Sequence, residues 1–246
     1  MDKYYMLIRR FVNASFRSLM RHHWDSSSLQ TYNDILTAKG GGPLWYLPTH
    51  RRFSHTHHTP FLPNVENPSS PDDNRIPSSL KYHLADIYLE ELDKVLAWDS
   101  EAGDERPPRA PIDTLIAPFL TLVARTTSNY TFDRVMSVVL EPLVQSLVPA
   151  GSPEPPSKKK RRLLGTEMSF VADNSCMSSS LPTTTAAAAA DADKPALHQA
   201  LLKQVFSVAS ERDTRDSNRR RLYKFWKSNL EDDDDDQGAP RDVDGS

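Results

Sequence analysis

Helical periodicity is the feature that most limits what this chain can fold into. Apolar residues recur every three or four positions in several long segments, whereas no alternation typical of a strand extends beyond four residues. We therefore predict an all-α fold, a helical-repeat-like array of amphipathic helices. The clearest predicted helices cover residues 3–23, 78–98 and 112–125, and a helical pair covers 195–229.

Local signals predict where these helices begin, end and bend. Three residues are placed to cap helices, namely Asp25, Ser78 and Thr131. The run Gly40–Gly42 is expected to end the helix that Asp25 begins. Prolines inside the predicted helices, Pro118 and Pro142, are expected to bend them.

Composition divides the 246 residues into ordered and disordered parts. Only 38% are hydrophobic and 19 are proline, which indicates one helical domain diluted by disordered sequence. We predict a helical domain over 1–148 that contains an irregular insertion over 43–77. A disordered, basic and low-complexity linker is expected over 149–194, a C-terminal helical pair packing on the domain over 195–229, and an acidic disordered tail over 230–246.

The first predicted helix has two distinct faces. At 100° per residue its apolar positions share one broad face, namely Tyr4, Leu7, Ile8, Phe11, Val12, Phe16 and Leu19. A basic stripe lies within about 40° elsewhere on the helix and consists of Lys3, Arg10, Arg17 and Arg21. The stripe fits a solvated face, a track for RNA phosphates, or salt bridges to an acidic partner helix.

Charge is distributed in blocks that cancel. The net charge is +5 over 1–60, −7 over 61–148, +1 over 149–194, +5 over 195–230 and −7 over 231–246, which gives −3 for the chain. Such asymmetry points to nucleic acid or charged protein partners.

Two basic runs are candidate functional sites. A nuclear-localisation signal is predicted at Lys158, Lys159, Lys160, Arg161 and Arg162. Near the C-terminus Arg219, Arg220 and Arg221 precede Tyr223, Phe225 and Trp226, a mixture of cations and aromatic rings that fits RNA contact. The alternative is a helix that buries its aromatic residues and leaves its arginines in water.

The residues do not indicate catalytic chemistry. The only metal-like grouping is a histidine cluster, His50, His55, His57 and His58. It has no cysteine or nearby acid, so we interpret it as a solvated polar insertion, with a metal-dependent hydrolase as the alternative. His83 is interpreted as a hydrogen-bonded, partly buried residue with Asp86 as a potential partner. We predict no enzyme, no cofactor, no small-molecule substrate and no membrane span.

Three segments, in order, resemble one eukaryotic family. The segment 1–16, MDKYYMLIRRFVNASF, resembles (L)DK-[FY]-Y-x-L-[IV]-R. The segment 76–92, IPSSLKYHLADIYLEEL, is similar to P-x-G-[IL]-x-[YF]-H-[LV]-x-D-I-[YFW]-x-[DE]-E-L. The segment 206–227, FSVASERDTRDSNRRRLYKFWK, resembles F-x-[IV]-A-S…T-x-x-x-N-R-[KR]-x-[LI]-Y. The family is that of ribosomal RNA-processing protein 1 (Nop52-like), and the likeness covers 1–148 and 195–229 outside the insertion.

The resemblance implies a non-enzymatic scaffold in nucleolar precursors of the large ribosomal subunit. Its implied partners are other assembly factors, with pre-rRNA as a further candidate, and its implied location is the nucleolus of the nucleus. A sequence-independent RNA-binding protein is the alternative. Family members have further N-terminal helices, and without these we expect the first helix to expose part of its apolar face.

Overall fold

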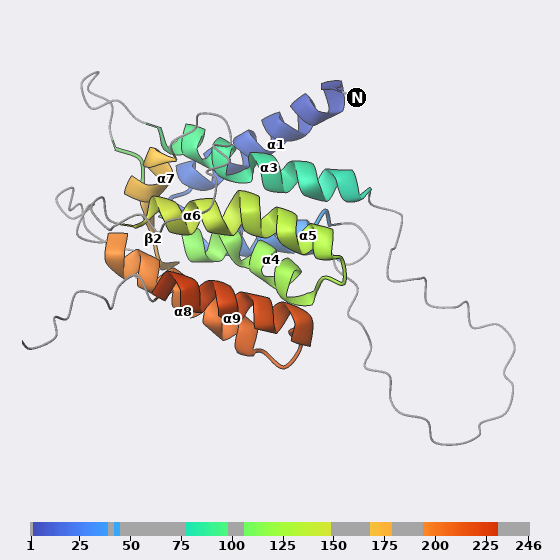
Figure 1. Cartoon of the computed structure of the whole chain (residues 1–246). Coiled ribbons are helices and arrows are strands. Elements are labelled where there is room, and N and C mark those ends of the chain that lie inside the picture. Colours follow the sequence, from blue (N-terminus) through green and yellow to red (C-terminus); the bar gives the residue numbers. More distant parts are fainter. Residues whose placement is uncertain are drawn as a thin grey trace, which may run out of the picture.

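Helices form where the apolar period runs, because each helix buries an apolar face against its neighbours. The computed structural model describes residues 2–38, 42–44, 77–97, 106–148, 168–178 and 194–230, and these fold mainly as helices (Figure 1). The helical class predicted from the sequence is confirmed, whereas the repeat arrangement stays a prediction.

The described elements follow the predicted order. They are α1 Asp2–Arg21, α2 Ser26–Thr37, α3 Ser78–Leu96, β1 Ala110–Pro111, α4 Ile112–Arg125, α5 Asn129–Val135, the π-helical turn η1 Met136–Leu140, α6 Glu141–Ser146, α7 Ser169–Asp173, β2 Ser175–Cys176, α8 Lys194–Ser210 and α9 Asp216–Leu230. Apart from Pro43, Leu44 and Pro77, the insertion predicted over 43–77 lies outside the described residues, as does the tail beyond Leu230.

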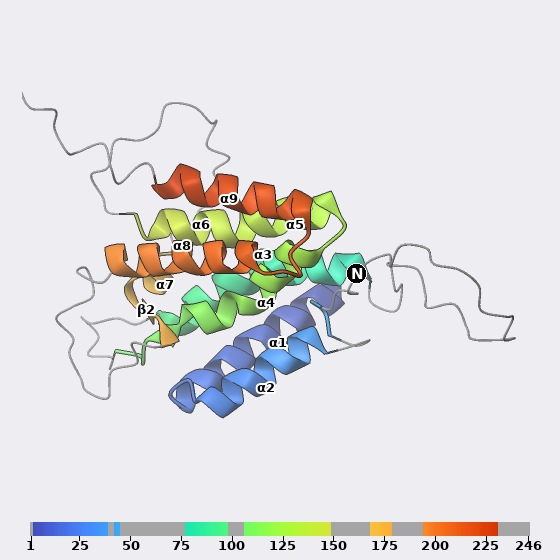
Figure 2. The same ribbon diagram turned by 90° about the horizontal axis from the view of Figure 1, so that it is seen from below.

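The core lies around α3 and α4. Tyr88 of α3 is fully buried, donates a 2.8 Å hydrogen bond to the Leu115 carbonyl and meets the Phe119 ring edge-on at 4.7 Å. Figure 2 shows α1 and α2 along one edge of the molecule and α9 along the opposite edge. The two ends of the described chain therefore lie on opposite sides of a shared core.

Two of the three predicted N-terminal caps are wrong, because the helices begin at other residues. Asp25 does cap α2, accepting from the Ser28 N–H at 3.0 Å. Ser78, however, already belongs to α3, whose cap position is Pro77. Ser128, not Thr131, caps α5 through a 3.2 Å bond from the Thr131 N–H. Both predictions failed because a residue inside the helix has the wrong backbone conformation for a cap.

Helix α2 ends before the glycine run, at Thr37. Gly42 instead closes the following turn, donating its N–H to the Ala38 carbonyl at 2.8 Å. A β-carbon at Gly42 would lie 2.4 Å from the Ala38 nitrogen, so the turn requires glycine. Gly40 and Gly41 lie outside the described residues.

Proline shapes the helix after α5. Pro142 has no N–H and would crowd the carbonyl four residues earlier in a regular helix. The preceding residues Met136–Leu140 form a π-helical turn, in which the Glu141 N–H bonds the Met136 carbonyl. This wider turn accommodates the proline. Pro118 lies inside α4, which continues unbroken to Arg125.

The prediction of a disordered linker over 149–194 is wrong for residues 168–178. They form α7 and β2, and β2 pairs in parallel with β1 through Ala110–Ser175 and Pro111–Cys176. Asp93 of α3 accepts the Val171 N–H at 2.9 Å. Composition failed to predict this because buried partners from distant helices order the segment. Residues 149–167 and 179–193 lie outside the described part.

A buried asparagine joins α9 to α4. The Asn218 side chain is 1% exposed, and its Nδ2 donates to the carbonyls of Val123, Ala124 and Thr126 at 2.9, 3.3 and 2.8 Å. These carbonyls lie at the C-terminal end of α4, where no further helical N–H can reach them. Asn218 therefore holds the C-terminal pair on the core.

Replacing Asn218 by alanine should destabilise the fold. The variant leaves buried carbonyls without a donor, so we expect a loss of about 2–3 kcal/mol. Urea unfolding of the full chain, followed by far-UV circular dichroism, measures it. Arg220→Ala is the matched control, because Arg220 is exposed on the same helix. Equal midpoints for the two variants would contradict the role given to Asn218.

Candidate interaction surface

Helices α1 and α3 meet through charged side chains. Arg9 of α1 donates from Nη1 and Nη2 to the two carboxylate oxygens of Glu90 at 2.7 and 2.8 Å. This hydrogen-bonded pairing lowers the pKa of Glu90 and raises that of Arg9. About one turn of α1 earlier, the Tyr5 carbonyl lies 3.1 Å from Nε2 of His83. These contacts join the first two segments of the family resemblance.

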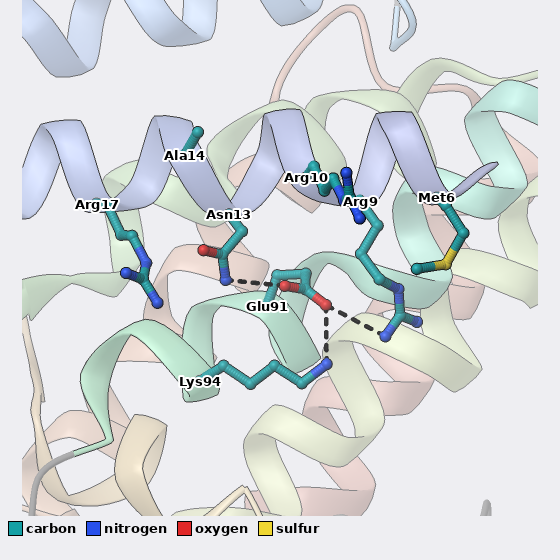
Figure 3. Close-up of a pocket in the computed structure, with 8 residues that line it drawn as sticks. All are labelled: Met6, Arg9, Arg10, Asn13, Ala14, Arg17, Glu91 and Lys94. Atoms are coloured by element: carbon teal, nitrogen blue, oxygen red, sulfur yellow. Dashed lines mark hydrogen bonds and ion pairs between the residues drawn. The ribbon is translucent and has the colours of Figure 1, made fainter. Parts of the chain in front are cut away.

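A buried carboxylate forms the floor of the groove between these helices. Glu91 is 3% exposed and accepts from Asn13 Nδ2 at 2.9 Å (Figure 3). Its Oε1 lies 2.9 Å from Lys94 Nζ and 3.2 Å from Arg9 Nη1. With three donors around it, the carboxylate is fully used in joining α1 to α3, which makes it unsuitable as a general base.

Cations outnumber acids along this groove. It has a volume of about 330 Å³ and is lined by Met6, Arg9, Arg10, Asn13, Ala14, Arg17, Glu91 and Lys94. The lining contains no serine, cysteine or histidine, so it holds no nucleophile and base pair of the usual kind. Within the described ranges, no group of three or more His, Cys, Asp or Glu side chains could hold a metal ion. The groove's chemistry is that of charge pairing.

The predicted basic stripe lies on the outer side of α1. Lys3, Arg10, Arg17 and Arg21 are all exposed. In the part of the chain that the structure describes, none of the four side chains forms a hydrogen bond or an ion pair. Arg10 and Arg17 also line the groove, Arg10 next to the paired Arg9 and Arg17 farther along, beyond Asn13 (Figure 3). Their positive charge is therefore available to a partner.

The apolar face of α1 is only partly covered. Val12, Phe16 and Leu19 are buried, whereas Tyr4, Leu7 and Phe11 are 75%, 49% and 64% exposed. Met6, at the groove, is 52% exposed. The expected exposure of part of this face is confirmed, and it lies next to the basic stripe.

The C-terminal arginines separate into two kinds. Arg219 donates to the carbonyls of Ala209, Glu211 and Thr214, which closes the turn between α8 and α9. Arg221 pairs with Asp133 and lies 3.8 Å from the centre of the Phe132 ring. Arg220 alone of the three is exposed. The predicted RNA contacts at Arg219 and Arg221 are thus already engaged in the fold, a use that their spacing along the chain did not reveal.

The remaining predicted residues have simpler outcomes. His83 is partly buried and hydrogen bonded, as predicted, and its ring also packs on the Tyr5 ring, with the centroids 4.4 Å apart. Asp86 does not pair with it and instead binds Arg134, with bonds of 2.6 and 2.8 Å. The nuclear-localisation run Lys158–Arg162 and the histidine cluster lie outside the described residues.

Sequence reasoning missed the residues that build the α1–α3 contact. Neither Glu91 nor Arg9 is among the residues that the sequence predicts for a functional site. The signal was available: an acid on an apolar face requires a buried partner, and Arg9 falls on the buried side of α1.

The Arg9–Glu90 pair predicts a pH-dependent stability difference between wild type and Glu90→Gln. The lowered pKa of Glu90 means that the ionised form stabilises the folded state above the ordinary glutamate pKa of 4.5. We expect the variant to lose about 1 kcal/mol at pH 7. The difference should shrink as the pH falls below 4.5 and vanish once the pH lies below the lowered pKa of Glu90, where Glu90 is protonated in the folded state. Urea unfolding at pH 7 and pH 3 measures it.

Asp213→Asn is the control for this comparison, because Asp213 is exposed and has no ion pair in the described ranges. A Glu90→Gln deficit that persists unchanged at pH 3 would show that packing, not charge, holds the two helices.

Comparison with known proteins places this chain in a family. The chain is similar to ribosomal RNA processing protein 1 homologue A of mouse, with 23% identity over 145 residues, which are 59% of this chain and 22% of that protein. It is 28% identical to the mouse homologue B over 58% of this chain and 15% of that protein, and 26% identical to the human homologue B over 58% and 14%. The chain thus spans less than a quarter of each of these relatives, and no solved structure matches it.

The family model covers nearly the whole described chain. The model described as nucleolar protein Nop52 matches residues 1–226, from α1 into α9. That range includes the α1–α3 contact and the Asn218 contact with α4. The chain therefore belongs to the Nop52 family of nucleolar proteins.

Proposed function

We propose that the protein is a non-enzymatic scaffold of nucleolar large-subunit precursor particles (pre-60S), needed for rRNA processing and for assembly of the large ribosomal subunit. Membership of the Nop52 family implies a role in rRNA processing, and the family's members are generally non-catalytic processing factors. The proposal adds the particle, the scaffold role and the partners, which are other large-subunit assembly factors.

The observation that carries the proposal is the division of charged residues between the interior and the surface. Glu90, Glu91 and Asp93 are engaged with partners from other helices or with Lys94. The exposed side of α1 instead presents cations and apolar side chains that have no partner in the described ranges. A surface of this kind serves binding rather than catalysis. No described helix is long and apolar enough to cross a membrane.

The scaffold proposal predicts a specific set of co-purifying molecules. Purification of the tagged full chain from its native cells should enrich large-subunit rRNA precursors and assembly factors. RNA hybridisation and mass spectrometry identify them, and a tagged unrelated nucleolar protein is the control. Depletion of the protein should also cause large-subunit precursors to accumulate. Recovery of neither precursors nor assembly factors would overturn the proposal.

Sequence-independent RNA binding is a second candidate function. It is favoured by the unpaired cations Arg10 and Arg17, which lie seven residues apart on one side of α1. A helix advances about 10.5 Å over seven residues, so the two guanidinium groups can reach separate phosphates.

RNA binding by this stripe would depend steeply on salt. Arg10→Gln/Arg17→Gln should reduce the slope of log affinity against log salt by about 1.4, since each single-strand phosphate contact contributes roughly 0.7. Fluorescence anisotropy with a single-stranded RNA oligonucleotide measures the slope. The control is Arg125→Gln/Arg134→Gln, which changes the net charge equally but removes arginines already paired with Glu211 and Asp86. Equal slopes for the two double variants would exclude the stripe as an RNA track.

A further inference from the structure

We propose that the end of α3 and residues 106–113 form a peptide-binding site, which the chain fills with its own segment 168–178. The segment is then an exchangeable ligand, and a peptide of the same chemistry from a partner protein takes its place. This inference goes beyond the proposed function and does not depend on it, because it concerns what the site recognises and not where the protein acts.

The segment is too short to fold alone. Helix α7 has five residues and β2 has two, whereas an isolated helix is marginal in water below about 12–15 residues. The segment packs on α3 and α6 where these two helices end (Figure 1). Its order therefore comes from the surface on which it lies, as it does for a bound peptide.

Helix α3 holds the first half of the segment. Asp93 is 6% exposed and accepts the Val171 N–H at 2.9 Å. The first N–H groups of a helix need acceptors from elsewhere, and for α7 a different helix provides one. The side chains of Val171 and Ala172 are buried. This part of the site thus recognises the main chain and a pair of small apolar side chains.

Asn174 makes the most specific contact. It is fully buried, its Oδ1 accepts from Arg106 Nε at 2.7 Å, and its Nδ2 lies 3.3 Å from the Leu96 carbonyl to which it donates. Its own carbonyl accepts the Ala110 N–H at 2.8 Å. The position requires a side chain that both donates and accepts, because an aspartate or a leucine would leave buried groups unpaired.

The second half of the segment binds by strand addition. Ala110 pairs with Ser175 and Pro111 with Cys176, in parallel. Arg109 donates from Nε and Nη2 to the Ser175 carbonyl at 3.1 and 2.7 Å. Main-chain bonds that hold an extended peptide at a strand edge are a recurrent mode of peptide recognition.

The chain's own segment is not the best ligand for this site. The Ser175 hydroxyl is buried and has no hydrogen-bond partner in the described ranges. Burying an unpaired hydroxyl weakens binding, so a peptide with alanine at this position fits better. The expected partner peptide therefore has two small apolar residues, asparagine two positions after them, and a small apolar residue next to the asparagine.

The segment lies apart from the contacts that hold the central helices together. The Tyr88–Phe119 contact, the α1–α3 ion pairs and the Asn218 bonds to α4 all involve other residues. Exchange of the segment leaves them intact. The stretches 149–167 and 179–193 tether it, which raises its local concentration, so a partner's peptide must bind more tightly to displace it.

Peptide exchange in the full chain tests the inference. Cleavage sites for a sequence-specific protease are inserted within 149–167 and within 179–193, and thermal unfolding of the uncut chain verifies that the fold is intact. After cutting at both sites, the chain should keep its helical circular dichroism. An excess of a fluorescent synthetic peptide of residues 168–178 should then replace the excised segment, and fluorescence anisotropy should rise to a plateau.

Variant peptides test the chemistry of recognition. Asn174→Ala should weaken binding about tenfold or more, because it removes the bonds to Arg106 and Leu96. Ser175→Ala should bind more tightly than the wild-type peptide. The matched control is Ser169→Ala, which should bind as the wild-type peptide does, because Ser169 is exposed.

The outcomes that overturn the inference are distinct. Loss of the helical signal after cutting would make segment 168–178 an integral part of the core. The same conclusion follows if the peptide fails to enter the site even when the cut chain is unfolded and refolded in its presence. Equal affinities of the Asn174→Ala and Ser169→Ala peptides, or weaker binding by Ser175→Ala, would contradict the recognition described above. None of these measurements involves ribosomal precursors, so their failure leaves the scaffold proposal untouched.

Discussion

The C-terminal part of the structure depends on the last carbonyls of α4, which have no N–H donor within their own helix. A helix end inside a protein needs donors from elsewhere, and Asn218 provides them to Val123, Ala124 and Thr126. The Arg215 N–H adds a 3.0 Å bond to the Ala124 carbonyl. Because α4 also packs against α2, α5 and α8, the position of α9 follows from the end of this central helix.

The three segments that resemble the family motifs contain residues that join the helices to one another. Thr214 donates its hydroxyl hydrogen to the Val208 carbonyl at 2.6 Å, Asn218 binds the end of α4, and Arg219 closes the turn between α8 and α9. In the first two segments Arg9 meets Glu90 across α1 and α3. Polar residues in these motifs join elements distant in sequence, so a motif match identifies the fold, whereas the neighbouring Arg10 has no side-chain partner in the described ranges.

Local chemistry determined what could be predicted. The helical period of the apolar residues predicts the helices. The cap at Asp25 is predictable because its partner, the Ser28 N–H, lies only three residues away. Residues whose partners lie far along the chain were not predictable in this way. Asp93 orders Val171 across 78 positions, and Arg221 pairs with Asp133 across 88. The exposed side of α1 was half predictable: its basic stripe followed from spacing, but which apolar residues stay uncovered depends on where α2 and α3 pack.

The ordered segment 168–178 joins the later part of the chain to the helices that precede it. Because α7 packs against α6 and α3, the chain that leaves α6 at Ser146 contacts the same helices again from Ser169 on. A single proteolytic cut between Val148 and Met168 would leave two fragments held together by α7 and the β1–β2 pair.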